Sequence, residues 1–164
     1  MLAATIFGSK ELKLDTGQLI GAILVIQLVA ILGAWLMSSL SARFGNLQVL
    51  FFVVLIWIGV CIAAYYTYTA TQFYMVAGVV GIIMGGIQSL SRSTYSLLMP
   101  PTHDTASFFS FYDVTEKLAI VIGMLSFGYI DSIMNMRSAI IALISFFTVG
   151  AIMLFIAMRK PQTN

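Results

Sequence analysis

Long stretches without a charged residue are the feature that most restricts how this chain folds. Residues 16–42, 44–91 and 138–158 contain no Asp, Glu, Lys or Arg. About 20 apolar residues cross a bilayer as a helix, so the 48 residues of the middle run must form two helices with a turn between them. The polar residues 67–72, accompanied by four tyrosines, supply that turn and an aromatic belt for the membrane interface.

The composition is typical of a protein embedded in a lipid bilayer. Hydrophobic residues make up 60% and charged residues 9% of the chain, and the mean hydropathy is +1.02. So few charges cannot cover the surface of a soluble 17.9 kDa protein, which excludes soluble enzymes and disordered chains. Continuous apolar runs exclude a transmembrane β-barrel, and scattered basic residues with a net charge of +2 exclude nucleic-acid binding. We therefore expect an all-α, polytopic helical membrane protein.

We expect five membrane-spanning helices in a single bundle formed by residues 1–164. Pro100-Pro101 cannot continue a helix and ends the third span, and Asp104 or Thr105 is a suitable N-cap for the fourth. The expected spans are roughly residues 17–42, 46–67, 72–98, 105–130 and 137–158.

The first seven residues are apolar but too short to span a membrane. Two interpretations stay open. The segment is either the end of a helix that begins before Met1, or a short interfacial tail that follows a true start codon.

The placement of Lys and Arg predicts the orientation of the chain. Arg43, Arg92 and the Arg159-Lys160 pair lie on one side, and three basic residues lie on the other. The positive-inside rule then places the C-terminus in the cytoplasm. The opposing basic residues are Lys10, Lys13 and Arg137.

The third expected span carries Gly78, Gly81, Gly85 and Gly86. Gly81 and Gly85 form a small-xxx-small pair, which lets two helix backbones approach closely. The simpler interpretation is a helix-packing face. The functional alternative is a helix that lines a cavity and bends during a conformational cycle. Arg92 lies about 9 Å before the end of this span, and we expect its long side chain to reach the membrane interface.

The fourth expected span carries Asp113, Glu116 and Lys117 near its middle. Their spacing places them on one helix face, about 14 to 20 Å beyond Asp104. A charge at the centre of a membrane helix costs about 2.5–3.5 kcal/mol, so these residues indicate a substrate or proton pathway. We expect Asp113 to pair with Lys117, and one of the two acids to retain its proton because one lysine cannot neutralise both. The alternative is a static structural ion pair.

Gln27 and Gln88 are further candidates for this pathway. Gln27 lies near the middle of the first span and also fits an interhelical hydrogen bond, and Gln88 belongs to the polar half of the third span. The single His103 and the single Cys61 provide neither a metal site nor a catalytic triad. We therefore expect no cofactor, no metal and no enzyme activity.

Two segments resemble one branch of the major facilitator superfamily. The string GGIQSLSRS at residues 85–93, with Tyr95 and Pro100, and the string from Phe108 to Asp113 with Lys117 are similar to the tenth and eleventh helices of vacuole-effluxer-like permeases. These permeases are related to fungal autophagy-associated amino-acid exporters. The resemblance implies a transporter of two six-helix halves with the substrate between them. This chain would be the C-terminal half, and its partner a missing N-terminal half.

The cytoplasmic loop motif of the superfamily is present only in part. Arg43 and Gly45 match the motif, whereas Ser38 replaces a glycine and Ala42 replaces an acid. These replacements put gating by this loop in doubt. Glu116 also departs from the branch, in which a small or uncharged residue is usual, so the resemblance does not extend to Glu116.

The leading hypothesis is therefore part of a secondary active transporter that moves a small-molecule substrate across a membrane by alternating access. Amino acids are candidate substrates, and the expected location is the inner membrane of a bacterium. The alternative is a small structural or assembly subunit of a membrane complex, which the glycine packing faces also fit.

Overall fold

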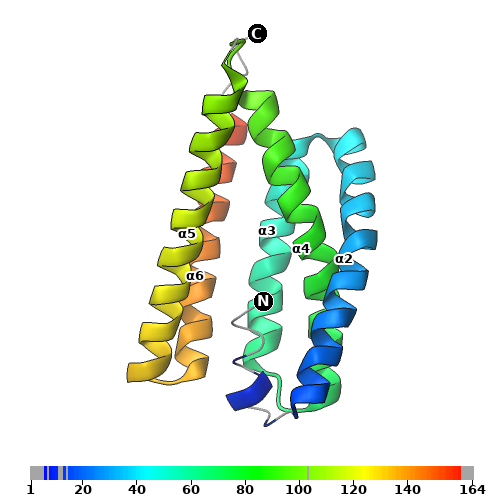
Figure 1. Cartoon of the computed structure of the whole chain (residues 1–164), viewed down its shortest axis with the longest axis vertical. Helices are drawn as coiled ribbons and strands as arrows, with labels where there is room; N and C mark the ends of the chain where they lie inside the picture. The colour runs from blue at the N-terminus through cyan, green and yellow to red at the C-terminus, as the bar shows by residue number, and fades with distance from the viewer. Residues whose placement is uncertain (1–5, 7, 11–12, 14, 103, 160–164) are drawn as a thin grey trace.

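The computed structural model describes all residues except 1–5, 7, 11–12, 14, 103 and 160–164. The expectations about His103, Lys160 and the first seven residues other than Ile6 lie outside the described residues. The described chain forms five long helices that run up and down in turn (Figure 1). They are α2 (Thr16–Phe44), α3 (Asn46–Tyr65), α4 (Ala70–Leu98), α5 (Thr105–Ile133) and α6 (Met136–Arg159).

The turns between the helices lie at two opposite ends of the bundle. The α2–α3 and α4–α5 turns lie at the end of the bundle where α6 also ends, which we call the Pro100 end (Figure 1). The α3–α4 and α5–α6 turns lie at the other end, which we call the Tyr68 end. The helix bounds differ from the expected spans by at most three residues, at the end of α5.

Local chemistry explains where the helices begin. Gly45 joins α2 to α3 with φ 88° and ψ 149°, a conformation essentially restricted to glycine. Thr69 and Gln72 form a capping box at the start of α4, in which the backbone N–H of Gln72 donates to the Thr69 hydroxyl at 3.3 Å. Asp104 caps α5 by accepting the backbone N–H of Ser107 at 3.2 Å, and the hydrogen bonds from Ser107 lower the pKa of Asp104.

The helices pack mainly in pairs. The interfaces of α2 with α4 and of α3 with α6 are extensive, α3 also contacts α4, and α5 packs on α6. Phe127 is the one residue of α5 that is classed as buried within the described chain. Figure 1 shows α4 and α5 converging towards the Pro100 end and separating towards the Tyr68 end. The contacts between α4 and α5 therefore concentrate near the turn that joins them.

Large apolar side chains cover the outside of the bundle. Trp35 is 71% exposed, Phe111 70% and Met153 68%, as suits a surface that lies against lipid. Four described helices, α2, α3, α4 and α6, are both long and apolar enough to cross a membrane. The chain is accordingly an integral membrane protein.

The α5 helix differs from those four. It has 29 residues, as many as α2 or α4, but Asp113, Glu116 and Lys117 lie within about one turn of it. Five spans were expected, and four helices of the described chain meet the criteria of length and apolar composition together. That α5 also crosses the membrane stays a prediction, supported by its course beside α6 in Figure 1.

Three glycines of α4 lie against α2. A Cβ placed on Gly85 would overlap the backbone carbonyl of Ala30, and one on Gly81 would come within 2.8 Å of the carbonyl oxygen of Ile26. Gly86 contacts the side chain of Met37, and Gly33 of α2 packs in turn against the backbone of Ile82. Close approach of two backbones thus explains why these positions lack a side chain.

Gly78 does not belong to this contact, although the sequence grouped it with the other three. A Cβ at Gly78 would meet no atom within 4 Å. Gly78 and Gly85 are seven residues apart and lie on nearly the same side of α4, so the two positions differ in how closely a neighbouring helix approaches them.

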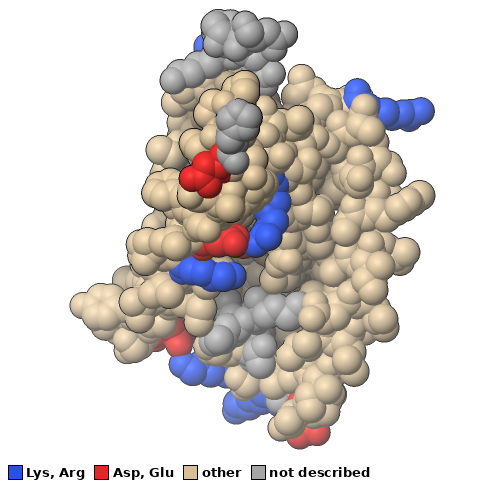
Figure 2. Space-filling model, turned by 45° about the horizontal axis from the view of Figure 1, so that its top comes forward, with Lys and Arg blue, Asp and Glu red and all other residues tan. Residues whose placement is uncertain are grey.

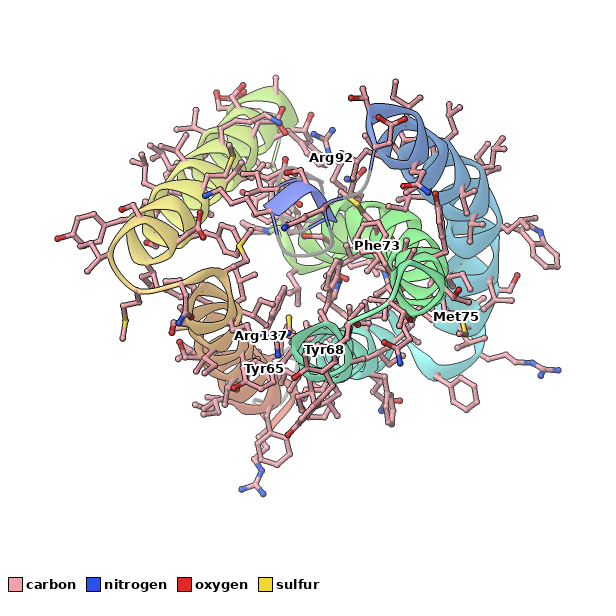
Figure 3. The ribbon with its side chains drawn as sticks, turned by 90° about the horizontal axis from the view of Figure 1, so that it is seen from below. Tyr65, Tyr68, Phe73, Met75, Arg92 and Arg137 are labelled. Carbon is pink, nitrogen blue, oxygen red and sulfur yellow. The ribbon has the colours of Figure 1, made fainter. Side chains whose placement is uncertain are left out.

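Arg137 ties two turns together at the Tyr68 end. One of its terminal nitrogens donates to the hydroxyl of Tyr68 at 2.6 Å and to the backbone carbonyl of Tyr65 at 3.2 Å. The guanidinium also lies 4.3 Å from the centre of the Tyr68 ring, a cation–π contact. Figure 3 shows the three residues together between α3 and α6.

We expect Arg137→Ala to destabilise the fold by about 1–2 kcal/mol, since it removes both hydrogen bonds and the ring contact. Unfolding of the purified chain in detergent micelles, followed by helical circular dichroism, measures this. The control is Arg43→Ala, which removes an exposed arginine at the other end. Equal loss of stability in the two variants would contradict the assignment.

Candidate functional site

A cluster of charged side chains joins α4 to α5. A terminal nitrogen of Arg92 on α4 lies 2.7 Å from a carboxylate oxygen of Asp113 on α5 and 3.7 Å from one of Glu116. One guanidinium is therefore shared by two carboxylates. We call Arg92, Asp113 and Glu116 the charge cluster.

Hydroxyl groups and aromatic rings surround the charge cluster. The hydroxyls of Ser91 and Tyr112 lie 2.7 Å apart, and the hydroxyl of Tyr95 donates to the backbone carbonyl of Phe108 at 2.9 Å. The rings of Tyr95 and Tyr112 are 4.9 Å apart between centres. The guanidinium of Arg92 lies 5.8 Å from the centre of the Tyr112 ring. These contacts hold the Pro100 ends of α4 and α5 together.

The charge cluster lies inside the length of the two helices and is not sealed within them. Asp113 follows the start of α5 by about 12 Å, and Arg92 precedes the end of α4 by about 9 Å. The side chains of Arg92, Asp113 and Glu116 are 55%, 48% and 32% exposed. Figure 2 shows acidic and basic side chains in contact on a face that is otherwise mostly uncharged. The cluster is thus accessible from outside the described helices.

Glu116 is the less well paired of the two acids. Its Oε2 atom is buried and has no hydrogen-bond partner among the described residues, and the nearest guanidinium nitrogen is 3.7 Å away. Asp113, in contrast, accepts a hydrogen bond from Arg92 at 2.7 Å. The two carboxyl groups therefore have different surroundings although they lie one turn apart.

The expected pairing of Asp113 with Lys117 is wrong. Asp113 pairs with Arg92, and Lys117 is exposed and forms no ion pair with the described residues. Arg92 was expected to reach the membrane interface, and the structure shows its side chain extending across to Asp113 and Glu116 of α5. A guanidinium carries several N–H donors at the end of a long side chain, so Arg92 can bind two carboxylates at once. The ammonium group of Lys117, on the same helix as both acids, is less suited to this.

The two glutamines expected on the pathway lie on different helices. Gln88 precedes Arg92 by one turn on α4 and shares much of its face, so it belongs beside the charge cluster. Gln27 lies on α2, and no described contact links it to the cluster. Both side chains are exposed and form no hydrogen bond within the described chain.

The loop-motif residues lie at the Pro100 end. Arg43 is exposed in the last turn of α2, and Gly45 makes the turn into α3. The next residue, Asn46, accepts a hydrogen bond from Ser41 and donates one to Ser93 of α4 at 2.8 Å. Sequence reasoning missed this link, because a lone Asn or Ser near a helix end carries no specific signal.

A partly open pocket of about 140 Å³ lies among the helices near Cys61. Its lining is almost wholly apolar, and it includes Ile26, Trp57, Phe73 and Phe127. Its lining offers a polar solute few hydrogen-bonding groups, chiefly the indole N–H of Trp57, which has no partner among the described residues, and the hydroxyl of Thr67. Among the described residues, no three of His, Cys, Asp and Glu are placed to hold a metal ion. The charge cluster is thus the best candidate for binding a polar molecule.

Comparison with known proteins gives a consistent result. A family model described as "Vacuole effluxer Atg22 like" matches residues 1–163. The uncharacterized MFS-type transporter YxiO of Bacillus subtilis is 30% identical over 162 residues, which cover 98% of this chain and 37% of YxiO. Autophagy-related protein 22 of Kluyveromyces lactis is 31% identical over 161 residues, which cover 90% of this chain and 32% of that protein. The similarities are to transporters rather than to enzymes.

Autophagy-related protein 22 of Eremothecium gossypii is also 31% identical, and the match covers 98% of this chain and 34% of that protein. The chain thus spans about a third of the length of these relatives. No solved structure matches the chain significantly.

Proposed function

Because this chain belongs to the vacuole effluxer Atg22-like family of the major facilitator superfamily, we propose that it is part of a secondary active transporter that moves small solutes by alternating access. The charge cluster between α4 and α5 lies on the transport pathway. The observation that carries this proposal is the sharing of Arg92 between Asp113 and Glu116 on a face that is open to its surroundings.

The energetics of the charge cluster favour a functional role. Ionised groups on a membrane helix are costly unless they are paired or reached by water, and they are rare outside pathways for substrates or ions. A static pair needs no access for a solute, yet about half of Arg92 and of Asp113 is exposed. Open, paired charges are what a solute needs in order to compete for one of the partners.

The remainder of the transporter supplies the other wall of the pathway. The relatives are about three times as long as this chain, and secondary transporters of this type bind substrate between two helical halves. We propose that this chain is the C-terminal half, that the open face of α4 and α5 points to the N-terminal half, and that Gln88 and Lys117 line the same pathway.

Proton binding by the acidic pair fits the same geometry. One guanidinium neutralises one carboxylate, so Asp113 and Glu116 together hold one charge too many unless a proton or Lys117 compensates for it. The pair is therefore a candidate proton carrier.

Amino acids are the proposed substrates, and a bacterial inner membrane is the proposed location. An α-amino acid carries a positive ammonium group and a negative carboxylate. The charge cluster offers partners for both, because it contains two carboxylates within one turn of α5 and the guanidinium of one residue of α4. The relatives named autophagy-related protein 22 are fungal, and YxiO is bacterial.

The double variant Arg92→Gln with Asp113→Asn tests the proposed function. It removes one acid and one base together, so the net charge of the chain is preserved. The proposed contacts with the solute are lost. Uptake of labelled amino acids is measured in vesicles that contain this chain with the segment that completes the length of its relatives. We expect transport to fall at least tenfold at an unchanged protein level. Normal uptake by the double variant would refute the proposed role.

We predict that the Pro100 end, with the C-terminus, faces the cytoplasm. Arg43 and Arg159 lie at this end, which the positive-inside rule favours, although Lys10 and Arg137 at the other end make the bias small. A reporter fused after Asn164 should be active only if it functions in the cytoplasm. Activity of a reporter that requires export would overturn this topology.

The alternative of a structural or assembly subunit has less support. This alternative was based mainly on the glycine face of α4. Three of those four glycines already pack against α2 of the same chain.

A further inference from the structure

We propose that Tyr112 is a positioning residue that holds the guanidinium of Arg92 in the orientation in which it binds both the carboxylates and the transported solute. This inference rests on the proposed function for its consequence in transport, whereas its structural part concerns the described residues alone.

The geometry places Tyr112 beside Arg92 in two ways. Its ring centre is 5.8 Å from the guanidinium carbon, within the range of a cation–π contact. Its hydroxyl lies 2.7 Å from that of Ser91, the residue before Arg92. Since Asp113 follows Tyr112 directly, two neighbouring residues of α4 meet two neighbouring residues of α5.

The Tyr112 side chain is itself held in place. It is partly buried, and its ring packs on that of Tyr95 at 4.9 Å between centres with an angle of 42°. Tyr95 is anchored in turn by its hydrogen bond to the carbonyl of Phe108. The ring of Tyr112 is therefore a fixed support, whereas the Arg92 side chain is 55% exposed and has many rotamers.

A fixed ring reduces the freedom of the arginine in a way that the ion pair alone does not. The carboxylate of Asp113 restrains one end of the guanidinium, and the ring contact, 5.8 Å from the guanidinium carbon to the ring centre, restrains its position. When a solute replaces a carboxylate on Arg92, that restraint is lost for a moment, but the ring remains. Tyr112 thus keeps Arg92 ready to bind, which lowers the cost of ordering it.

The first test measures the exposure of Arg92 in the full 164-residue chain in lipid vesicles. Phenylglyoxal modifies accessible arginines, and mass spectrometry of the peptides gives a rate for each one. We expect Tyr112→Leu to raise the rate at Arg92 about three- to tenfold, because the ring contact is lost. Tyr112→Phe keeps the ring and should stay within twofold of the unchanged chain. Ser91→Ala, which removes the hydroxyl partner, should match Tyr112→Phe.

Internal controls separate a local change from misfolding. The rate at Arg137, which is enclosed by Tyr65 and Tyr68, reports on the fold, and the exposed Arg43 reports on the reagent. Tyr129→Leu changes an exposed tyrosine of the same helix and should leave Arg92 unaffected. An unchanged rate at Arg92 in Tyr112→Leu, or an equal rise in Tyr112→Phe, overturns the proposal.

The second test measures transport by the completed transporter. A positioning role predicts that Tyr112→Leu raises the KM for the solute about three- to tenfold while the maximal rate stays within twofold, and that Tyr112→Phe restores the KM. A fall in maximal rate with an unchanged KM contradicts the positioning role. If the unchanged protein transports no solute, the proposed function fails, and the phenylglyoxal rates still decide whether Tyr112 positions Arg92.

Discussion

Alanine at Gly85 is expected to destabilise the protein by about 1–3 kcal/mol, whereas alanine at Gly78 is expected to leave it unchanged or stabilise it by up to about 1 kcal/mol. The two glycines lie two turns apart on α4. A Cβ at Gly85 would overlap the carbonyl of Ala30, so the backbones of α2 and α4 would have to separate. At Gly78 the new methyl group meets no atom within 4 Å, and alanine favours the helix.

The measurement is the midpoint of unfolding of each variant in the same detergent. Because helical propensity acts equally at both positions, the difference between the two variants isolates the contact with α2. Gly33→Ala provides a second check from the α2 side, since its Cβ would overlap the backbone of Ile82. If Gly85→Ala is as stable as Gly78→Ala, the close approach of α2 and α4 is not what stabilises the fold.

The second large effect is expected from Arg92→Gln alone. It leaves Asp113 and Glu116 without their shared cation, and an uncompensated charge on a membrane helix costs about 2.5–3.5 kcal/mol. We expect the variant to unfold at lower denaturant concentration and to accumulate less in the membrane. Because the cluster is partly exposed, the effect is smaller than this cost, and we expect the free energy of unfolding to fall by about 2 kcal/mol.

A double-mutant cycle with Asp113→Asn distinguishes the pairing of Asp113 with Arg92 from a pairing of Asp113 with Lys117 within α5. The double variant Arg92→Gln with Asp113→Asn should regain part of the lost stability, because Glu116 is then the one member of the cluster left without its cation. The same cycle with Lys117→Met in place of Arg92→Gln should show no coupling, as Lys117 has no ion pair with described residues. Coupling to Lys117 and not to Arg92 would contradict the structure.

These two predictions concern the two ways in which α4 is fixed. Along its middle the glycines of α4 contact the backbone of α2 directly, and nearer the Pro100 end its polar residues reach α5 through side chains. The first contact is rigid because backbone atoms cannot change rotamer. The second depends on hydrogen bonds and charges that a solute or a proton is able to replace. We therefore expect relative motion to be easier between α4 and α5 than between α2 and α4.

The sequence by itself determined the helices and their order. Uncharged runs set the apolar segments, Pro100 ended α4, and a capping residue began the next helix near Thr105. These features act within one turn of the chain, so they can be read without knowing its neighbours. The sequence also identified Asp113 and Glu116 as residues with a high free-energy cost in a membrane. That cost depends on the type of residue and on its depth in the hydrocarbon layer.

Only the tertiary structure decided which helices and charges meet. Arg92 and Asp113 are 21 residues apart, and their pairing depends on the rotation of α4 and α5 about their axes. That rotation follows from the packing of α4 on α2 and of α5 on α6, which no local pattern contains. The same holds for Gly78 and Gly85, which are equal as residues but face different surroundings. Helix formation is a local property, whereas the partner of a side chain is fixed by every contact that orients its helix.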